Sequence, residues 1–228
     1  MKCLITSGGT TEPIDQVRGI TNHASGWLGK IMAETCLAAG HEVTLVTTKQ
    51  AVKPDAHPKL SVTIISDVAS LITVLKPLVQ SHDVCIHSMA VSDYTPVYMT
   101  DLEEVEKTSD LRQLLTKKNN DTKISSHSDY QVLLLKKTPK IIGHIKDWNP
   151  NIKLVGFKLL VDVSRDELFA VAKSSLMKNR ADFILANDLM EINQDKHRGY
   201  LLTADEVFEA ETKEQIAQLI LEKVTTHA

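Results

Sequence analysis

Short apolar runs that alternate with helix-like patterns constrain the fold of this chain more than any other feature. Several of these runs are apolar throughout, which is typical of parallel strands covered on both faces. The predicted strands are Cys3–Thr6, Val43–Thr47, Val62–Ile65, Val84–His87, Leu154–Phe157 and Phe183–Ala186. Near the end of the chain, residues 199–202 and 207–210 have the pattern of a terminal hairpin.

Helical periodicity fills the intervals between these runs. Helices are expected over Ser25–Ala39, Asp67–Gln80, Arg165–Asn179 and Thr212–Val224, with Gly40 ending the first and Pro77 kinking or shortening the second. Strands that alternate with helices imply right-handed crossovers and a mainly parallel sheet. The sequence therefore predicts an α/β, Rossmann-like, doubly wound fold.

One polar segment interrupts this alternation. Residues 95–122 are charged, and acidic in their first half, so we expect an insertion or a flexible flap there. After it, residues 123–136 predict a β-hairpin apart from the main sheet, with Lys123–Ser126 and Tyr130–Leu135 as its strands. The simplest organisation is one domain over residues 1–228 with this excursion.

Composition excludes several classes of function. The net charge is -3 and only 4% of residues are aromatic, which argues against a nucleic-acid partner. Cys3, Cys36 and Cys85 are far apart and form no C-x-x-C pair, so buried free thiols are favoured over a metal or redox site. The chain shows no signal peptide and no apolar run long enough to span a bilayer, so we expect no membrane partner and a cytoplasmic location.

A glycine turn follows the first predicted strand. Gly8 and Gly9 allow the backbone to approach a ligand closely, and the long loop after them leads to the next helix. Ser25 is the expected N-cap of that helix, and Gly26 and Gly29 leave room for an anion above its N-terminus. A tight turn and a plain helix cap explain the same residues, so this segment alone leaves nucleotide binding open.

Polar residues also follow two later strands. Asp93 lies in the segment after Val84–His87, and Asn187 ends the strand that begins at Phe183. In open α/β sheets, ligands bind at the carboxyl ends of the strands, so these loops are expected to converge on one edge. Asp93 could hydrogen-bond a substrate, or it could simply cap its own loop.

Motifs of several enzyme classes are absent from the sequence. There is no G-x-S-x-G, no H-E-x-x-H and no Walker-type phosphate loop. A nicotinamide-dependent reductase on the same fold would need G-x-G-x-x-G and a hydride-site pair such as Tyr-x-x-x-Lys, and neither occurs. The residues alone therefore indicate a nucleotide-binding α/β protein and do not indicate which reaction it catalyses.

The order of the motifs resembles a known family, the phosphopantothenoylcysteine synthetases (phosphopantothenate–cysteine ligases). Two N-terminal segments carry most of the resemblance, Ile5–Asp15 (ITSGGTTEPID) and Val17–Gly26 (VRGITNHASG). It continues in order through Ala90–Tyr94, Lys123-Ile124, Lys137–Pro139, Val155–Lys158 and Ala186–Asp188. Because no flavin-dependent decarboxylase segment precedes these motifs, the stand-alone form of the enzyme is expected, without flavin.

The resemblance implies a reaction in coenzyme A biosynthesis. The family joins 4'-phosphopantothenate and L-cysteine through an acyl-nucleotidylate intermediate, with Mg²⁺ and with CTP as the favoured nucleotide and ATP as the alternative. It also implies a homodimer with active sites near the subunit boundary. A catalytically silent nucleotide-binding module remains the rival, although Asn22 and Lys123, which such a module could lose, are both present.

The resemblance also assigns roles to individual residues. Asn22 would stabilise charge at the reacting carbonyl, and Lys123 would promote the first half-reaction. Arg18 would bind the substrate phosphate from a neighbouring subunit, with Ala90 and Asp93 positioning the pantothenate arm. The residues implied to bind the nucleotide are Gly8, Gly9, Ser25, Gly26, Gly29, Phe157, Lys178 and Asn187. The resemblance assigns no metal ligand.

This sequence departs from the family pattern at several positions. Ala24 stands where serine is usual, and Trp27 replaces a basic residue. Ser125 and Ser126 follow Lys123-Ile124 where further lysines are common, and Ser175 occupies a position that often holds lysine, with Lys178 and Arg180 nearby as substitutes. These changes reduce the positive charge available to a triphosphate.

Overall fold

An eight-stranded mixed sheet forms the centre of the molecule in a computed structural model, which describes residues 1–119, 122–125, 127–193 and 196–226. The strand order is β12-β11-β10-β9-β6-β1-β4-β5. Its strands are β1 (Lys2–Ser7), β4 (Glu42–Thr48), β5 (Leu60–Ile65), β6 (Val84–His87), β9 (Lys153–Leu160), β10 (Phe183–Asp188), β11 (Gly199–Leu202) and β12 (Val207–Ala210). The pairs from β5 to β10 are all parallel, and β11 and β12 add an antiparallel edge. This sheet confirms the predicted fold class and the terminal hairpin.

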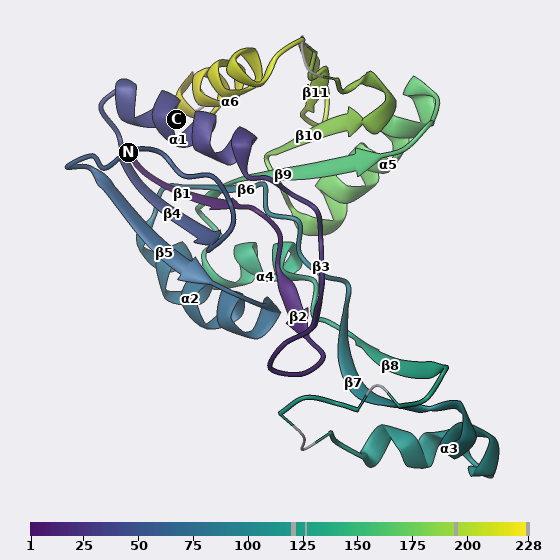
Figure 1. The fold of residues 1–228 in the computed structure, drawn as a ribbon. Helices are drawn as coiled ribbons and strands as arrows, with labels where there is room; N and C mark the ends of the chain where they lie inside the picture. The colour runs from purple at the N-terminus through teal and green to yellow at the C-terminus, as the bar shows by residue number, and fades with distance from the viewer. Residues whose placement is uncertain (120–121, 126, 194–195, 227–228) are drawn as a thin grey trace.

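Helices cover both faces of the sheet (Figure 1). One face packs on α1 (Trp27–Ala38) and α6 (Lys213–Thr226), through a core that includes Cys3, Ile5 and Met32. The other packs on α2 (Val68–Ser81), α4 (Ile141–Trp148) and α5 (Arg165–Asn179), through a core that includes Leu4 and Leu75. Neighbouring strand residues face opposite cores, and each buried Leu or Ile contributes about 1.5–3 kcal/mol.

Two features of the helical layer differ from expectation. Pro77 does not shorten α2, because it lies on the exposed side of the helix while Leu75 and Val79 remain buried. Proline has no backbone N–H, so the carbonyl four residues before Pro77 lacks its helical hydrogen bond, and on the exposed side water can bond to it. Helix α4 was not predicted, because its eight residues include Gly143 and are too few to show a full amphipathic repeat.

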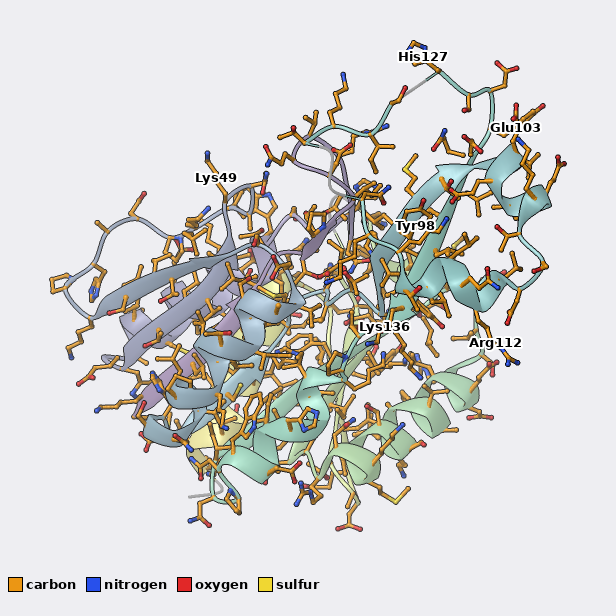
Figure 2. The ribbon with its side chains drawn as sticks, turned by 90° about the horizontal axis from the view of Figure 1, so that it is seen from below. Lys49, Tyr98, Glu103, Arg112, His127 and Lys136 are labelled. Carbon is orange, nitrogen blue, oxygen red and sulfur yellow. The ribbon has the colours of Figure 1, made fainter. Side chains whose placement is uncertain are left out.

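A separate two-stranded sheet projects from the body (Figure 1). It pairs β7 (Tyr94–Asp101) with β8 (Gln131–Lys137), and α3 (Leu102–Lys107) and the 3₁₀ helix η1 (Leu111–Thr116) follow β7. We call residues 94–137 the arm. Figure 2 shows its labelled residues Tyr98, Glu103, Arg112 and His127, whereas Lys49 lies on the main body beyond β4.

The arm bears on two predictions. The segment 95–122, expected to be an insertion or a flexible flap, lies outside the main sheet and contains β7, α3 and η1 among its described residues. The predicted hairpin over 123–136 is wrong, because β8 pairs with β7, and Lys123–Ser125 form no strand, while Ser126 lies outside the described residues. Strand β7 was not predicted because it contains Pro96, and proline within a run argues against a strand. A register shift between Pro96 and Tyr98 accommodates this proline in the sheet.

A short ribbon occupies the loop between the first strand and the first helix. It pairs β2 (Thr11–Pro13) with β3 (Gly19–Thr21), with residues 14–18 as its tip. The ribbon lies between the main sheet and the arm (Figure 1). Each of its strands has three residues, too few for a recognisable alternation, so the sequence indicated only a long loop. For the described residues, every helix is too short or too polar to cross a membrane.

Candidate active site at the carboxyl edge of the sheet

The glycine turn after β1 packs tightly against its neighbours. Gly8 has φ of 83°, a left-handed conformation that favours glycine, and a Cβ atom on it would lie 2.8 Å from Ala51 Cβ. A Cβ atom on Gly9 would lie 2.3 Å from the carbonyl oxygen of Asn22. The two glycines therefore let the turn pass between the segment after β4 and the segment before α1.

Asn22, Gly9 and Ala90 come together at this turn. The side-chain Nδ2 of Asn22 donates to the carbonyl oxygen of Ala90 at 3.2 Å, and Gly9 and Ala90 form a parallel β-bridge. The Ala90 amide in turn donates to the Gly8 carbonyl at 2.9 Å. Two of the predicted loops thus meet at the carboxyl ends of β1 and β6, as the strand order requires.

A cavity of about 650 Å³ opens beside these residues. Of the predicted site residues, Gly9, Asn22 and Ser25 line it. Ala24, singled out as a departure from the family pattern, also lines it. Sequence reasoning missed the other lining residues as ligand contacts, namely Thr11, Thr21, His23, Thr48 and Gln50. Thr48 and Gln50 could have been found, because they end and follow a parallel strand on the same edge. The lining contains no lysine or arginine, so backbone amides are its main donors for an anion.

Helix α1 begins at this cavity without a side-chain cap. Its N-cap is Gly26, with φ of 84° and no capping hydrogen bond from a side chain, so the prediction of Ser25 as N-cap is wrong. The Ser25 carbonyl oxygen instead accepts from Val52 N at 3.0 Å, which holds the residue outside the helix. The first amides of α1 therefore keep their capacity to bind an anion.

Gly29 serves packing within the body. It is buried one turn into α1, where a Cβ atom would lie 2.2 Å from Ser7 Oγ. Close contact between α1 and the end of β1 requires this glycine, and the contact places the start of α1 next to the glycine turn. This geometry favours a packing role for Gly29 over direct contact with a nucleotide.

Arg18 and Lys123 lie at the tip of the ribbon, away from Asn22. Arg18 and Asn22 flank β3 at its two ends, about 13 Å apart along an extended chain. The Arg18 Nη2 atom lies 2.6 Å from Asp15 Oδ2 and donates to the Ile124 carbonyl at 2.9 Å, so it sits beside Lys123 in the chain. A second cavity of about 570 Å³ is lined by Asp15 and Arg18, and it shares Thr11, Thr48 and Gln50 with the first.

Asp93 lies where the arm leaves the sheet. Its carboxylate pairs with the ammonium group of Lys140, and its carbonyl oxygen accepts from Thr138 N at 2.9 Å. The side chain of Thr138 donates to the Ser92 carbonyl at 2.5 Å, which fixes both strand ends of the arm. Asp93 is thus close in sequence to Ala90 but lies toward the arm.

Phe157 and Asn187 lie on neighbouring parallel strands. Phe157 is half-buried in β9, and Asn187 is buried near the carboxyl end of β10. The Asn187 amide donates to the Arg198 carbonyl at 2.6 Å, so it is oriented toward β11. Next to it, hydrogen bonds from the backbone amides of Met190, Val163 and Asp162 lower the pKa of the Asp188 carboxyl.

Lys178 is the one predicted nucleotide residue that the fold carries to the opposite edge. It lies in the last turn of α5, and the chain enters the amino end of β10 directly after this helix. The six residues of β10 therefore separate Lys178 from the carboxyl edge by about 20 Å. Arg180, considered as a substitute cation, pairs with Asp147 at the same distant edge.

Two further departures from the family pattern have clear positions. Ala24 lines the first cavity, and Trp27 is exposed in the first turn of α1. The Lys30 ammonium lies 5.6 Å from the centre of the Trp27 ring, so one positive charge remains beside this turn. Lys30 is also paired with Glu34, which reduces its availability to a ligand.

No group of three metal-ligating side chains occurs among the described residues. The buried imidazole nearest to the site is His87 at the end of β6, and its Nδ1 atom lies 2.8 Å from Thr6 Oγ1. Burial lowers the pKa of His87 to about 4. His87 is therefore a neutral core residue near pH 7 and does not supply a positive charge to the edge.

The fold and the cavity define a doubly wound α/β protein with a candidate ligand site at the carboxyl edge. Within that class, the chain belongs to the family described as the DNA/pantothenate metabolism flavoprotein C-terminal domain, which matches residues 1–227. The resemblance that the order of the motifs indicated is thereby confirmed at the level of the family.

Individual relatives agree with this assignment. The chain is 30% identical over 226 residues to the coenzyme A biosynthesis bifunctional protein CoaBC of Thermococcus kodakarensis, covering 98% of this chain and 50% of that protein. The chain thus spans about half the length of this curated relative. The crystal structure of the DNA/pantothenate metabolism flavoprotein from Streptococcus pneumoniae is 55% identical, with a TM-score of 0.96 and full coverage of both chains. A crystal structure of the C-terminal domain of CoaBC, 24% identical over 99% of this chain and 94% of that one, shares the fold with a TM-score of 0.74.

Proposed function

We propose that the chain is a phosphopantothenate–cysteine ligase that acts in coenzyme A biosynthesis. The observation that carries the proposal is the meeting of Gly9, Asn22 and Ala90 beside a cavity at the uncapped start of α1. Family membership and the name of the Thermococcus relative support a role in pantothenate metabolism and coenzyme A biosynthesis. The substrates, 4'-phosphopantothenate and L-cysteine, are proposed from the resemblance of the motifs.

The first half-reaction joins the pantothenate carboxylate to the nucleotide. A carboxylate oxygen attacks the α-phosphorus of the nucleoside triphosphate, the bond to the bridging oxygen breaks, and pyrophosphate leaves. The backbone amides around Gly8, Gly9, Ser25 and Gly26 are proposed to hold the phosphates, because glycine and an uncapped helix start expose donors there. Lys123 is proposed to stabilise the charge that develops on the triphosphate.

The second half-reaction forms the amide. The amine of cysteine attacks the acyl carbon of the intermediate, and the nucleoside monophosphate leaves with the bonding electrons. The Asn22 side chain reaches the backbone of Ala90 and is exposed to the cavity, so it is proposed to contact the acyl group during this step. Phe157 and Asn187 are proposed to hold the nucleoside, and Ala90 and Asp93 the pantothenate arm.

The nucleotide is proposed to be CTP, with ATP as the alternative, and Mg²⁺ is proposed to accompany the triphosphate. The described side chains alone do not form a cage for this ion, so its protein ligands are not assigned. The proposed location is the cytoplasm.

A homodimer is proposed because two predicted residues lie away from the cavity. Arg18 and Lys123 occupy the ribbon tip, at the far end of β3 from Asn22. From there they are proposed to act on the site of a neighbouring subunit, with Arg18 binding the substrate phosphate. Analytical ultracentrifugation at working concentration tests this point, and a monomer would remove the role of Arg18 across an interface.

The decisive experiment measures pyrophosphate release by the purified protein. With Mg²⁺, 4'-phosphopantothenate and cysteine, release is expected with CTP or ATP, to depend on phosphopantothenate and to yield the cysteine adduct. Asn22→Ala is expected to reduce it by about 10²–10³-fold, whereas Asn151→Ala, an exposed asparagine at the amino edge, is the matched control. Folded protein that releases no pyrophosphate with either nucleotide would favour a silent nucleotide-binding module.

A further inference from the structure

A buried carboxylate forms the centre of the ribbon tip. The side chain of Asp15 is 0% exposed, and it accepts five hydrogen bonds. Its Oδ1 atom accepts from the amides of Val17 at 2.9 Å and Arg18 at 2.8 Å. Its Oδ2 atom accepts from Arg18 Nε at 3.0 Å, Arg18 Nη2 at 2.6 Å and the Ile124 amide at 3.1 Å.

The two oxygens have different tasks. The bonds to Oδ1 are local and close the turn of the ribbon, as an aspartate or asparagine does in many turns. Of the bonds to Oδ2, the one from the Ile124 amide joins the ribbon to a segment more than one hundred residues later in the chain. The two from Arg18 orient the guanidinium, which also donates to the Ile124 carbonyl. The guanidinium of Arg18 and these amides hold the pKa of the Asp15 carboxyl well below its usual range, so the charge that orders this contact persists in mild acid.

Lys123 is held from both sides by this arrangement. The residue before it, Thr122, accepts from Gln16 N at 3.2 Å through its carbonyl oxygen. The residue after it, Ile124, donates to Asp15 and accepts from Arg18 Nη2 at 2.9 Å, and its side chain is buried. Lys123 itself is exposed between these two anchors.

We propose that Asp15 is a positioning residue for Lys123, and that it presents Lys123 and Arg18 to substrate as one unit. The catalytic role of Lys123 in this inference rests on the proposed function. The hydrogen bonds between Asp15, Arg18 and Ile124 are independent of that function. A lysine on a free loop would lose conformational freedom on meeting the triphosphate, and a backbone anchored on both sides reduces that loss.

Replacing Asp15 by asparagine separates the turn from the anchor. Asparagine has one acceptor oxygen, which can keep the bonds from Val17 and Arg18 amides. Its NH₂ group would then face the N–H donors of Arg18 and Ile124, with which it cannot bond. The matched control is Asp67→Asn, a carboxylate that lines the same second cavity but caps α2 and does not contact residues 122–124.

Hydrogen exchange on the full chain tests the anchor without relying on activity. In Asp15→Asn, the Ile124 amide is expected to exchange at least about tenfold faster, while the amides of β3 and of the main sheet are unchanged. The Asp67→Asn control is expected to leave Ile124 unaffected. Unchanged exchange at Ile124 in a folded variant would overturn the proposal. If Asp15→Asn does not fold, Asp15→Ser, whose hydroxyl can still accept a turn hydrogen bond, replaces it.

Pyrophosphate release then tests the link to Lys123. Asp15→Asn is expected to lower kcat by about 100-fold, and the double variant with Lys123→Gln is expected to be no slower than Lys123→Gln alone. Effects that multiply instead would overturn positioning through Lys123. If the unmodified protein releases no pyrophosphate, the proposed function fails, and exchange at Ile124 still decides whether Asp15 anchors the segment.

Discussion

Gly29 of α1 lies directly against Ser7 of β1, so that a Cβ atom on the glycine would stand 2.2 Å from the serine Oγ and 2.4 Å from its Cβ. The same hydroxyl donates to the Gly26 carbonyl at 3.2 Å. Ser7 thus contacts both the N-cap residue Gly26 and the first turn of α1. This close approach sets the start of the helix over the glycine turn.

Gly29→Ala is expected to destabilise the protein by about 1–3 kcal/mol, because the added methyl group must displace the end of β1 or tilt α1. The measurement is the free energy of unfolding in urea. Activity is expected to fall as well, since the start of α1 moves with the helix.

Gly143→Ala is the matched control, because this glycine also lies inside a helix. A Cβ atom there would meet only Asn179 Oδ1, at an ordinary 3.6 Å. Alanine favours the helix more than glycine by up to about 1 kcal/mol, so this variant is expected to be as stable as the parent or more stable. Equal stability of Gly29→Ala and Gly143→Ala would contradict the close-packing account.

Asn22→Asp changes one NH₂ group to oxygen and hardly changes shape. The side-chain NH₂ group of Asn22 now donates a hydrogen bond to the Ala90 carbonyl oxygen, and a carboxylate oxygen in its place would be repelled by that oxygen. The carboxylate would also add negative charge beside the proposed phosphate site. Because the residue is exposed, the unfolding midpoint is expected to stay unchanged, while pyrophosphate release falls by about 10²–10³-fold. Activity equal to that of the parent would remove Asn22 from the proposed mechanism.

The parallel sheet could be predicted from the sequence because strand segments such as Phe183–Ala186 are buried on both faces and are therefore apolar throughout. Gly9 and Ala90 could be placed together because each lies beyond a strand end on the same edge, and Asn22 because it leads into the helix that starts beside the glycine turn. Lys178 could also have been placed at the opposite edge, because the predicted helix that contains it leads directly into the predicted strand that begins at Phe183 and therefore ends at the amino end of that strand.

The arm shows a second limit of prediction. The pairing of β7 with β8 joins segments about forty residues apart, and local periodicity carries no information on such a partner. Asp15 illustrates the same point within the site. From the sequence, Asp15 is predicted only to be a turn residue, as its bond from Val17 confirms. Its hydrogen bond from Ile124 depends on the tertiary fold, so the local sequence could not predict it.

Arg198 is expected to hold together a group of acidic side chains. Its guanidinium lies 3.4 Å from Glu191, 3.2 Å from Glu209 and 2.8 Å from Glu211. All four side chains are partly exposed, so Arg198→Met is expected to reduce stability by only about 1–3 kcal/mol in dilute buffer.

Salt should reveal the electrostatic origin of that loss. In 1 M NaCl the Debye length falls to about 3 Å, so repulsion among the remaining carboxylates is screened and much of the difference from the parent should disappear. Arg112→Met, on the arm in Figure 2, is the control, because Arg112 has no ion pair with the described residues. A salt-independent loss in Arg198→Met would point to packing instead of charge.

Acid is expected to unfold the protein partly through His87. Burial lowers its pKa to about 4 in the folded protein, whereas an unfolded histidine takes up a proton near pH 6.5. Between these values the unfolded chain binds more protons, so stability contributed by the neutral imidazole is present above about pH 6.5 and is lost as the pH falls toward 4. The shift corresponds to about 3 kcal/mol. His197, whose pKa burial also lowers to about 4, adds to the same trend.

His87→Gln removes one of these two titrations while keeping a group that can hydrogen-bond Thr6 Oγ1. The free energy of unfolding, measured in urea from pH 7 to pH 4.5, is expected to fall less steeply in this variant than in the parent. His127→Gln is the control, since His127 is exposed on the arm (Figure 2). The same slope in the parent and in His87→Gln would mean that the His87 imidazole is already protonated in the folded protein, or already neutral in the unfolded chain, over this range.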